Sequence, residues 1–142
     1  MINLTTHGLP RFVEAQDRVF DSVCDELALG EKTTHWMWFV FPQLQGLGKS
    51  AVAKHYAIKS AEEALTYWQH PVLGPRLVTC VKLVLAQPNT MARDVFGSPD
   101  DLKFKSCLTL FGHVAPEETV FKQALTRFFA GKPDEATLKL LA

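Results

Sequence analysis

The residues whose types and spacing could do chemistry are concentrated between His35 and Ser50, in the run HWMWFVFPQLQGLGKS. Two of the three tryptophans and two of the ten phenylalanines fall within six residues of this run. Aromatic residues at this density are typical of a hydrophobic core, and they could also wall a small-molecule pocket completed by polar groups. The polar groups available for that purpose are those of His35, Gln43, Lys49 and Ser50. Both interpretations are compatible, because a binding pocket needs a rigid wall.

The glycine-rich end of this run, residues 46–50, invites comparison with two nucleotide-binding motifs. A P-loop requires a glycine five positions before its Gly-Lys-Ser, but Gln43 stands there, preceded by Pro42, which has no N–H to donate. The glycine spacing over 46–51 also matches a relaxed dinucleotide fingerprint. That fingerprint works only between a parallel strand and a helix, and no second strand is indicated downstream. Neither motif is therefore supported.

What remains is a tight turn containing Gly46 and Gly48 before a helix that we expect to begin around Ser50. The glycines could serve backbone geometry alone. The N–H groups at the helix start could instead hold an anionic group, with Lys49 adding positive charge.

Two cations outside this segment could complete an anion site. Arg76 follows a Gly-Pro pair at an expected helix start, where a cation is unfavourable with respect to the helix dipole. A residue placed against local preference often has a partner, here a buried carboxylate or a ligand anion. Lys103 is the second candidate, although it could equally lie on a solvated helix face.

The first functional hypothesis is a pocket built around residues 35–50 that binds an anionic or nucleotide-like small molecule, in a binding protein or an enzyme. It requires the candidate side chains to converge on one concave site. The candidates are His35, Trp38, Gln43, Gly46, Gly48, Lys49, Ser50, Arg76 and Lys103.

No metal site is expected, because the histidines and cysteines lack the spacing of metal ligands. We interpret Cys24, Cys80 and Cys107 as reduced core residues, since they are far apart and form no CxxC motif. His35 is the histidine that could do acid–base chemistry, with a structural hydrogen bond as the alternative. His70 lies at an expected helix junction, where a bond to a backbone carbonyl would be ordinary. No catalytic residue or cofactor is assigned.

The elements that must position these residues are predicted to be helices. Start signals occur at Pro10, Ser60, Pro75, Ser98, Pro116 and Asp134. Stop signals occur at Gly30 and Gly131. The run 35–41 is the one strand-like segment, but it lacks alternation and a partner. The pattern predicts an all-α, compact single-domain bundle of about six to seven helices, with the aromatic and glycine-rich segment packed in the middle. We place a tail at residues 1–8 and one helical domain at 9–142.

The composition excludes several classes of protein. The chain has 142 residues, of which 47% are hydrophobic and 21% charged, as in an ordinary globular domain and unlike a disordered or fibrous chain. Fifteen basic and fifteen acidic residues cancel, so no nucleic-acid partner is expected. The longest apolar run is far shorter than the ~20 residues of a membrane span, and the N-terminus lacks the pattern of a signal peptide. We therefore expect a soluble, cytoplasmic protein with no membrane partner.

Motifs spread over nearly the whole chain, from about residue 9 to 141, resemble the domain-of-unknown-function 1810 family. They are RFVEAQ at 11–16, HWMWFVFPQ at 35–43, GLG at 46–48, HPVLGPRL at 70–77, FGSPDDLK at 96–103 and TLF at 109–111. The resemblance implies a small, mainly helical, bacterial-type protein without an established activity, and it transfers no catalytic residues. Some members carry the label calpastatin, but calpastatins are long disordered inhibitors, whereas this composition is that of a compact domain.

A second functional hypothesis is a non-enzymatic interaction module, in which the aromatic segment packs against a partner protein or forms a homodimer or other homo-oligomer. It predicts an exposed apolar patch of several hundred Å² and no enclosed polar pocket. The first hypothesis is preferred, because a protein–protein surface would not need a glycine turn and cations near the aromatic run.

Overall fold

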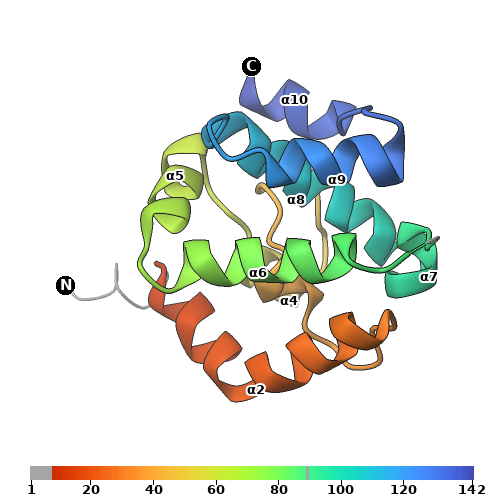
Figure 1. Cartoon of the computed structure of the whole chain (residues 1–142). Coiled ribbons are helices and arrows are strands. Elements are labelled where there is room, and N and C mark those ends of the chain that lie inside the picture. The colour runs from red at the N-terminus through yellow and green to blue at the C-terminus, as the bar shows by residue number, and fades with distance from the viewer. Residues whose placement is uncertain (1–7, 89) are drawn as a thin grey trace.

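The computed structural model describes residues 8–88 and 90–142 (Figure 1). All but the last residue of the tail expected at 1–8 therefore lies outside the described residues. Within the described residues there are nine helices, and pairing outside them is limited to an isolated parallel bridge between Leu44 and Ile58. The helices are α2 (Pro10–Leu29), α3 (Met37–Val40), α4 (Ala51–His55), α5 (Ala61–Gln69), α6 (Leu73–Leu85), α7 (Ala92–Phe96), α8 (Asp100–Val114), α9 (Val120–Phe129) and α10 (Glu135–Leu141). The prediction of an all-α fold is confirmed.

Local capping chemistry explains where several helices begin and end. The Ser60 hydroxyl accepts a hydrogen bond from the Glu63 N–H at 3.1 Å, and the Asp134 carboxylate accepts one from the Thr137 N–H at 3.0 Å. At the end of α2, Gly30 adopts a left-handed φ of 78°, a conformation that glycine tolerates without steric cost. These boundaries match the predicted signals.

Other boundaries differ from those that the sequence pattern indicates. The strand-like aromatic run contains the short helix α3, and a second short helix, α7, has no clear signal in the sequence. Helix α9 begins at Val120 because the residues after Pro116 first form a turn. Ser98 does not cap α8: Pro99 occupies the capping position, and no side chain caps this helix.

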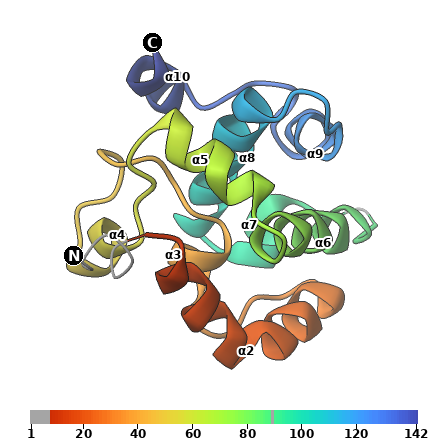
Figure 2. The same cartoon turned by 90° about the vertical axis from the view of Figure 1, so that its left-hand side faces the viewer.

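Helix α8 is the centre of the packing. It contacts α5, α7, α9 and α10, while α2 lies across the other side of the molecule against α6 (Figures 1 and 2). The aromatic segment inserts between these groups of helices: Trp36 and Phe41 are each 1% exposed, and the Phe41 ring meets the Phe104 ring of α8 edge-on at 5.1 Å. The aromatic part of the segment is therefore packed in the middle of the bundle, as predicted, whereas its glycine-rich end, residues 45–50, lies at the surface.

The helices of the described residues include none with the length and apolar character that crossing a membrane demands.

Candidate functional site

Five of the nine candidate residues line one groove on the surface. The groove has a volume of about 450 Å³ and runs between the glycine turn and α4 on one side and the starts of α8 and α10 on the other. The candidate residues in it are Gln43, Gly48, Lys49, Ser50 and Lys103. Its remaining lining residues are Leu47, Ala53, Pro99, Leu102, Ser106, Asp134 and Ala136.

Trp38 lines a separate small cavity that shares Gln43, Gly48 and Lys103 with the groove. This cavity is also bounded by Tyr56 and has a volume of about 10 Å³, comparable to the space that one water molecule needs. No ring system fits there unless a side chain moves. The aromatic run thus fills the core instead of walling a ligand-sized pocket.

Three candidate residues do not line the groove or this cavity. His35 is exposed. Gly46 has a φ of 104°, and a Cβ there would meet Leu140 at 3.4 Å, so its role is in the geometry of the turn. Arg76 is paired within the protein: its Nη2 lies 2.8 Å from the Asp17 Oδ1 of α2. The sequence left a buried carboxylate or a ligand anion open as the partner of Arg76. The partner in the structure is a carboxylate, that of Asp17, but it is exposed and not buried.

Close packing between the turn and α4 shapes the near wall of the groove. A Cβ at Gly48 would lie 2.5 Å from the Cβ of Ala53, so only glycine allows the turn to approach α4 this closely. Ser50 caps α4 by accepting a hydrogen bond from the Ala53 N–H at 3.1 Å. This leaves the Ser50 hydroxyl hydrogen available to donate to a ligand.

Backbone pairing fixes the position from which Gln43 reaches the groove. The Ile58 N–H donates to the Gln43 carbonyl at 2.9 Å, and the Gln45 N–H donates to the Ile58 carbonyl at 2.7 Å. These two bonds tie the segment before the glycine turn to the segment after α4.

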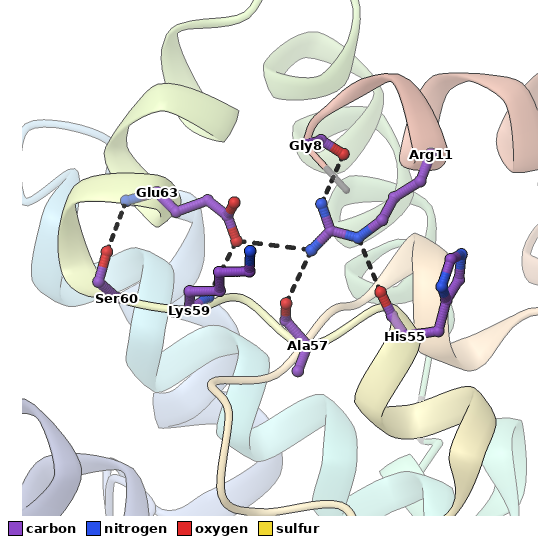
Figure 3. Close-up of polar contacts among 7 residues, drawn as sticks. All are labelled: Gly8, Arg11, His55, Ala57, Lys59, Ser60 and Glu63. Carbon is purple, nitrogen blue, oxygen red and sulfur yellow. Dashed lines mark hydrogen bonds and ion pairs between the residues drawn. The ribbon is translucent and has the colours of Figure 1, made fainter. Parts of the chain in front are cut away.

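The buried side chain of Arg11 fixes the segment after α4 through hydrogen bonds to backbone carbonyls (Figure 3). The Arg11 side chain is 4% exposed; its Nε donates to the His55 carbonyl and its Nη2 to the Ala57 carbonyl, both at 2.8 Å. The Glu63 carboxylate lies 3.5 Å from Nη2 and also accepts a hydrogen bond from the Lys59 N–H. Burial lowers the pKa of Arg11, while Glu63 opposes that shift. Sequence reasoning gave Arg11 no role, because its partners are carbonyl groups that no pattern marks.

A buried glutamate fixes the other end of the aromatic segment. Glu26 Oε1 accepts hydrogen bonds from the Thr33 and Thr34 N–H groups and from the Trp36 indole N–H, at 2.7–3.0 Å. Burial alone would raise the pKa of Glu26, but the hydrogen bonds from Thr34, Thr33 and Trp36 outweigh it and lower the pKa to about 2.

Two lysines among the lining residues favour the binding of anions in the groove. Lys103 extends over the Trp38 ring, with Nζ 5.6 Å from the ring centroid and 3.5 Å from Asp100 Oδ1. Lys49 is exposed and has no hydrogen-bond or ion-pair partner in the described part of the chain. Asp134 places one carboxylate among the lining residues. Lysine ammonium groups of this kind bind phosphate or carboxylate.

The histidines, cysteines and acidic residues of the described part of the chain do not form a metal-binding or reactive-thiol arrangement. The described residues contain no group of three or more His, Cys, Asp or Glu side chains placed to hold a metal ion. Burial raises the pKa of the Cys80 and Cys107 thiols, so these thiols stay protonated and unreactive. His70 differs from expectation: its Nδ1 accepts hydrogen bonds from the Val72 and Leu73 N–H groups, so the ring meets the start of α6 and binds no carbonyl there.

Apart from the groove and the small cavity beside Trp38, a further cavity of about 350 Å³ lies between α8, α9 and α10. We call it the second cavity, and none of the candidate residues lines it. Leu125 and Leu138 contribute to its apolar wall, and His113, Glu118 and Lys122 are its titratable lining residues. These residues are scattered in the sequence among helix signals, so nothing in the pattern marked them.

Comparison with known proteins places the chain in a family. A family model described as "Protein of unknown function (DUF1810)" matches residues 6–141. The chain belongs to this family. The resemblance inferred from the sequence motifs is thereby confirmed.

A solved structure also resembles this DUF1810 chain closely. It is the crystal structure of the conserved hypothetical protein Rv1873 from Mycobacterium tuberculosis, which is 46% identical. The match covers 96% of this chain and 97% of that one, with a TM-score of 0.94. No curated protein matches the chain. The comparisons establish the fold and the family, and they supply no activity.

Proposed function

We propose that this protein binds a small anionic molecule in the groove between the glycine turn, α4 and the starts of α8 and α10. The observation that carries the proposal is the convergence of Lys49 and Lys103, which are far apart in the sequence, on the same groove as Gln43 and Ser50. Two cations and two uncharged polar groups around one concavity match the chemistry of anion recognition.

Each of these groups is available to a ligand. Lys49 is exposed, and the Gln43 side-chain amide has no hydrogen-bond partner among the described residues. Among the described residues, Lys103 makes one ion pair, with Asp100 at 3.5 Å, in addition to its contact with the Trp38 ring, and its side chain is 26% exposed. A ligand phosphate or carboxylate can compete with so long an ion pair.

The geometry favours binding over catalysis, and favours a small ligand over a protein partner. Among the residues that line the groove, no acid and base lie at hydrogen-bond distance from each other. The aromatic segment exposes little apolar surface on which a partner protein could pack. Four of its residues are each 3% exposed or less, namely Trp36, Met37, Val40 and Phe41. Of the four aromatic residues at 36–41, Trp38 and Phe39 are the partly exposed ones.

Thermal unfolding against a panel of inorganic phosphate, pyrophosphate, sugar phosphates and nucleotides tests the proposal. A ligand at a hundred times its dissociation constant adds about 2.7 kcal/mol to the free energy of unfolding, which raises the midpoint by several degrees. We expect Lys49→Ala and Lys103→Ala to reduce this shift at fixed ligand concentration. Lys54→Ala, which removes an exposed lysine of α4 outside the groove, should preserve it.

Two outcomes would overturn the proposal. One is the absence of a midpoint shift with every anion in the panel. The other is a shift that survives both groove variants and disappears in His113→Ala or Lys122→Ala, which would assign binding to the second cavity.

A further inference from the structure

We propose that the ligand of this groove is a phosphorylated sugar, with its phosphate near Lys49 and Lys103 and its hydroxyl groups donating to Asp134. This inference rests on the proposed function, since it names the class of anion that the groove takes. It starts from the one carboxylate among the groove residues, which a site for simple anions would not need.

Asp134 is held in a fixed orientation at the start of α10. Its Oδ2 accepts hydrogen bonds from the Thr137 N–H at 3.0 Å and from the Thr137 hydroxyl at 2.6 Å. Its own N–H donates to the Thr109 hydroxyl oxygen at 2.9 Å. Both side-chain bonds use Oδ2, so Oδ1 is the oxygen left to accept from a ligand.

The lining of the groove therefore combines two lysines with one carboxylate. No lysine of the described residues lies within ion-pair distance of Asp134, so the carboxylate is not neutralised by the cations that share its groove. A ligand that is anionic throughout would be repelled by Asp134. A ligand with a phosphate at one end and hydrogen-bond donors at the other satisfies both the lysines and the carboxylate.

Hydroxyl groups suit this lining better than an ammonium group does, because Lys49 and Lys103 of the same groove repel the ammonium charge. Uncharged side chains in the groove also match hydroxyls. The Gln43 amide can both donate and accept, and the Ser106 hydroxyl, which donates to the Leu102 carbonyl at 3.2 Å, keeps its oxygen as an acceptor.

Size points to the sugar phosphate itself and not to a base-stacked nucleotide. The groove volume of about 450 Å³ lies within the range of small-molecule sites. The neighbouring cavity beside Trp38, at about 10 Å³, gives a nucleobase no room to stack on that ring. The sugar and its phosphate therefore carry the recognition.

The test compares four phosphate monoesters by titration calorimetry with the full chain. Ribose 5-phosphate and glucose 6-phosphate carry hydroxyls, butyl phosphate carries none, and phosphoethanolamine carries an ammonium group. We expect the sugar phosphates to bind at least tenfold more tightly than butyl phosphate and phosphoethanolamine, as hydrogen bonds to a charged acceptor imply.

Asp134→Asn isolates the carboxylate, because the asparagine oxygen can still accept the capping bonds from Thr137 while the negative charge is lost. We expect this variant to lose the tenfold preference for sugar phosphates and to bind butyl phosphate at least as well as the unchanged protein. Glu135→Gln, a neighbouring exposed carboxylate outside the groove, is the matched control and should keep the preference.

The outcomes separate this inference from the proposed function. Equal binding of sugar phosphates and butyl phosphate, a preference that survives Asp134→Asn, or tighter binding of phosphoethanolamine overturns the sugar-phosphate assignment and leaves an anion groove in place. Failure of every phosphate to bind removes both.

Discussion

At the scale of single residues, Glu26 determines how the chain enters the aromatic segment. Four donors from Thr33, Thr34 and Trp36 converge on one carboxylate, and their hydrogen bonds favour its ionised form. A group whose pKa is lower in the folded state than in the unfolded state stabilises the fold above its ordinary pKa. That stability is lost as the pH falls through the folded value.

The pKa of Glu26, at about 2 against an ordinary value of 4.5, therefore predicts a loss of stability between about pH 5 and pH 2. Glu26→Gln should lower the free energy of unfolding at pH 7 by about 2 kcal/mol and flatten its decline in this acid range. Urea unfolding at a series of pH values measures both effects. Glu31→Gln, at an exposed neighbour, should keep the decline of the unchanged protein; an equally steep decline in Glu26→Gln would refute the assignment.

At the scale of helices, the junction between α5 and α6 depends on a close approach of backbones. A Cβ at Gly74 would lie 2.1 Å from the Trp68 carbonyl oxygen, a contact that no side-chain movement can relieve. His70 contributes to the same junction by accepting from the first N–H groups of α6. The junction explains why glycine stands inside a helix, where it is otherwise unfavourable.

Gly74→Ala should consequently lower the free energy of unfolding by about 2 kcal/mol or more. Gly112→Ala is the matched comparison, because Gly112 also lies inside a helix but its Cβ would make an ordinary 3.6 Å contact with Phe121. That variant should be neutral or more stable by about 0.5–1 kcal/mol. Chemical denaturation of the two variants decides the point: equal stabilities would show that the Trp68 contact has no cost.

The same scale shows what the sequence could predict. The starts at Ser60 and Asp134 and the end at Gly30 depend on local chemistry, which is written in a few adjacent residues. Helix α3 has no such local mark, because all four of its residues are apolar and therefore show no helical period in the sequence. Tertiary packing therefore decides its conformation.

The residues of the groove likewise divide into those that the sequence could predict and those that only the fold reveals. Gln43, Gly48, Lys49 and Ser50 were predictable together, since one short turn carries them. Ser106, within α8, and Asp134, which caps α10, are brought to the groove only by the fold. In the sequence, the pattern around Asp134 predicts a helix cap and nothing more. For Arg76, the sequence left a carboxylate and a ligand anion open as partners, and the structure pairs it with the exposed carboxylate of Asp17 on the neighbouring helix α2.

At the scale of the whole molecule, Arg11 connects the first helix to the wall of the groove. Its guanidinium binds the carbonyls of His55, at the end of α4, and of Ala57 (Figure 3). The next residue along the chain, Ile58, pairs through its backbone with Gln43 and Gln45. The groove's shape thus depends on a contact outside it. Loss of a buried charge-assisted network of this kind is among the larger effects that one substitution has on stability.

Arg11→Lys keeps the charge but cannot reproduce the planar fork that reaches the carbonyls of Gly8, His55 and Ala57 and the Glu63 carboxylate together. We expect it to lower the free energy of unfolding by about 1–3 kcal/mol and to speed amide hydrogen exchange over residues 50–58 more than in α9. Arg76→Lys, which loosens a more exposed ion pair between α2 and α6, should leave exchange over 50–58 unchanged. Uniform acceleration across all helices would instead mean that Arg11 supports the fold as a whole and has no specific hold on the groove.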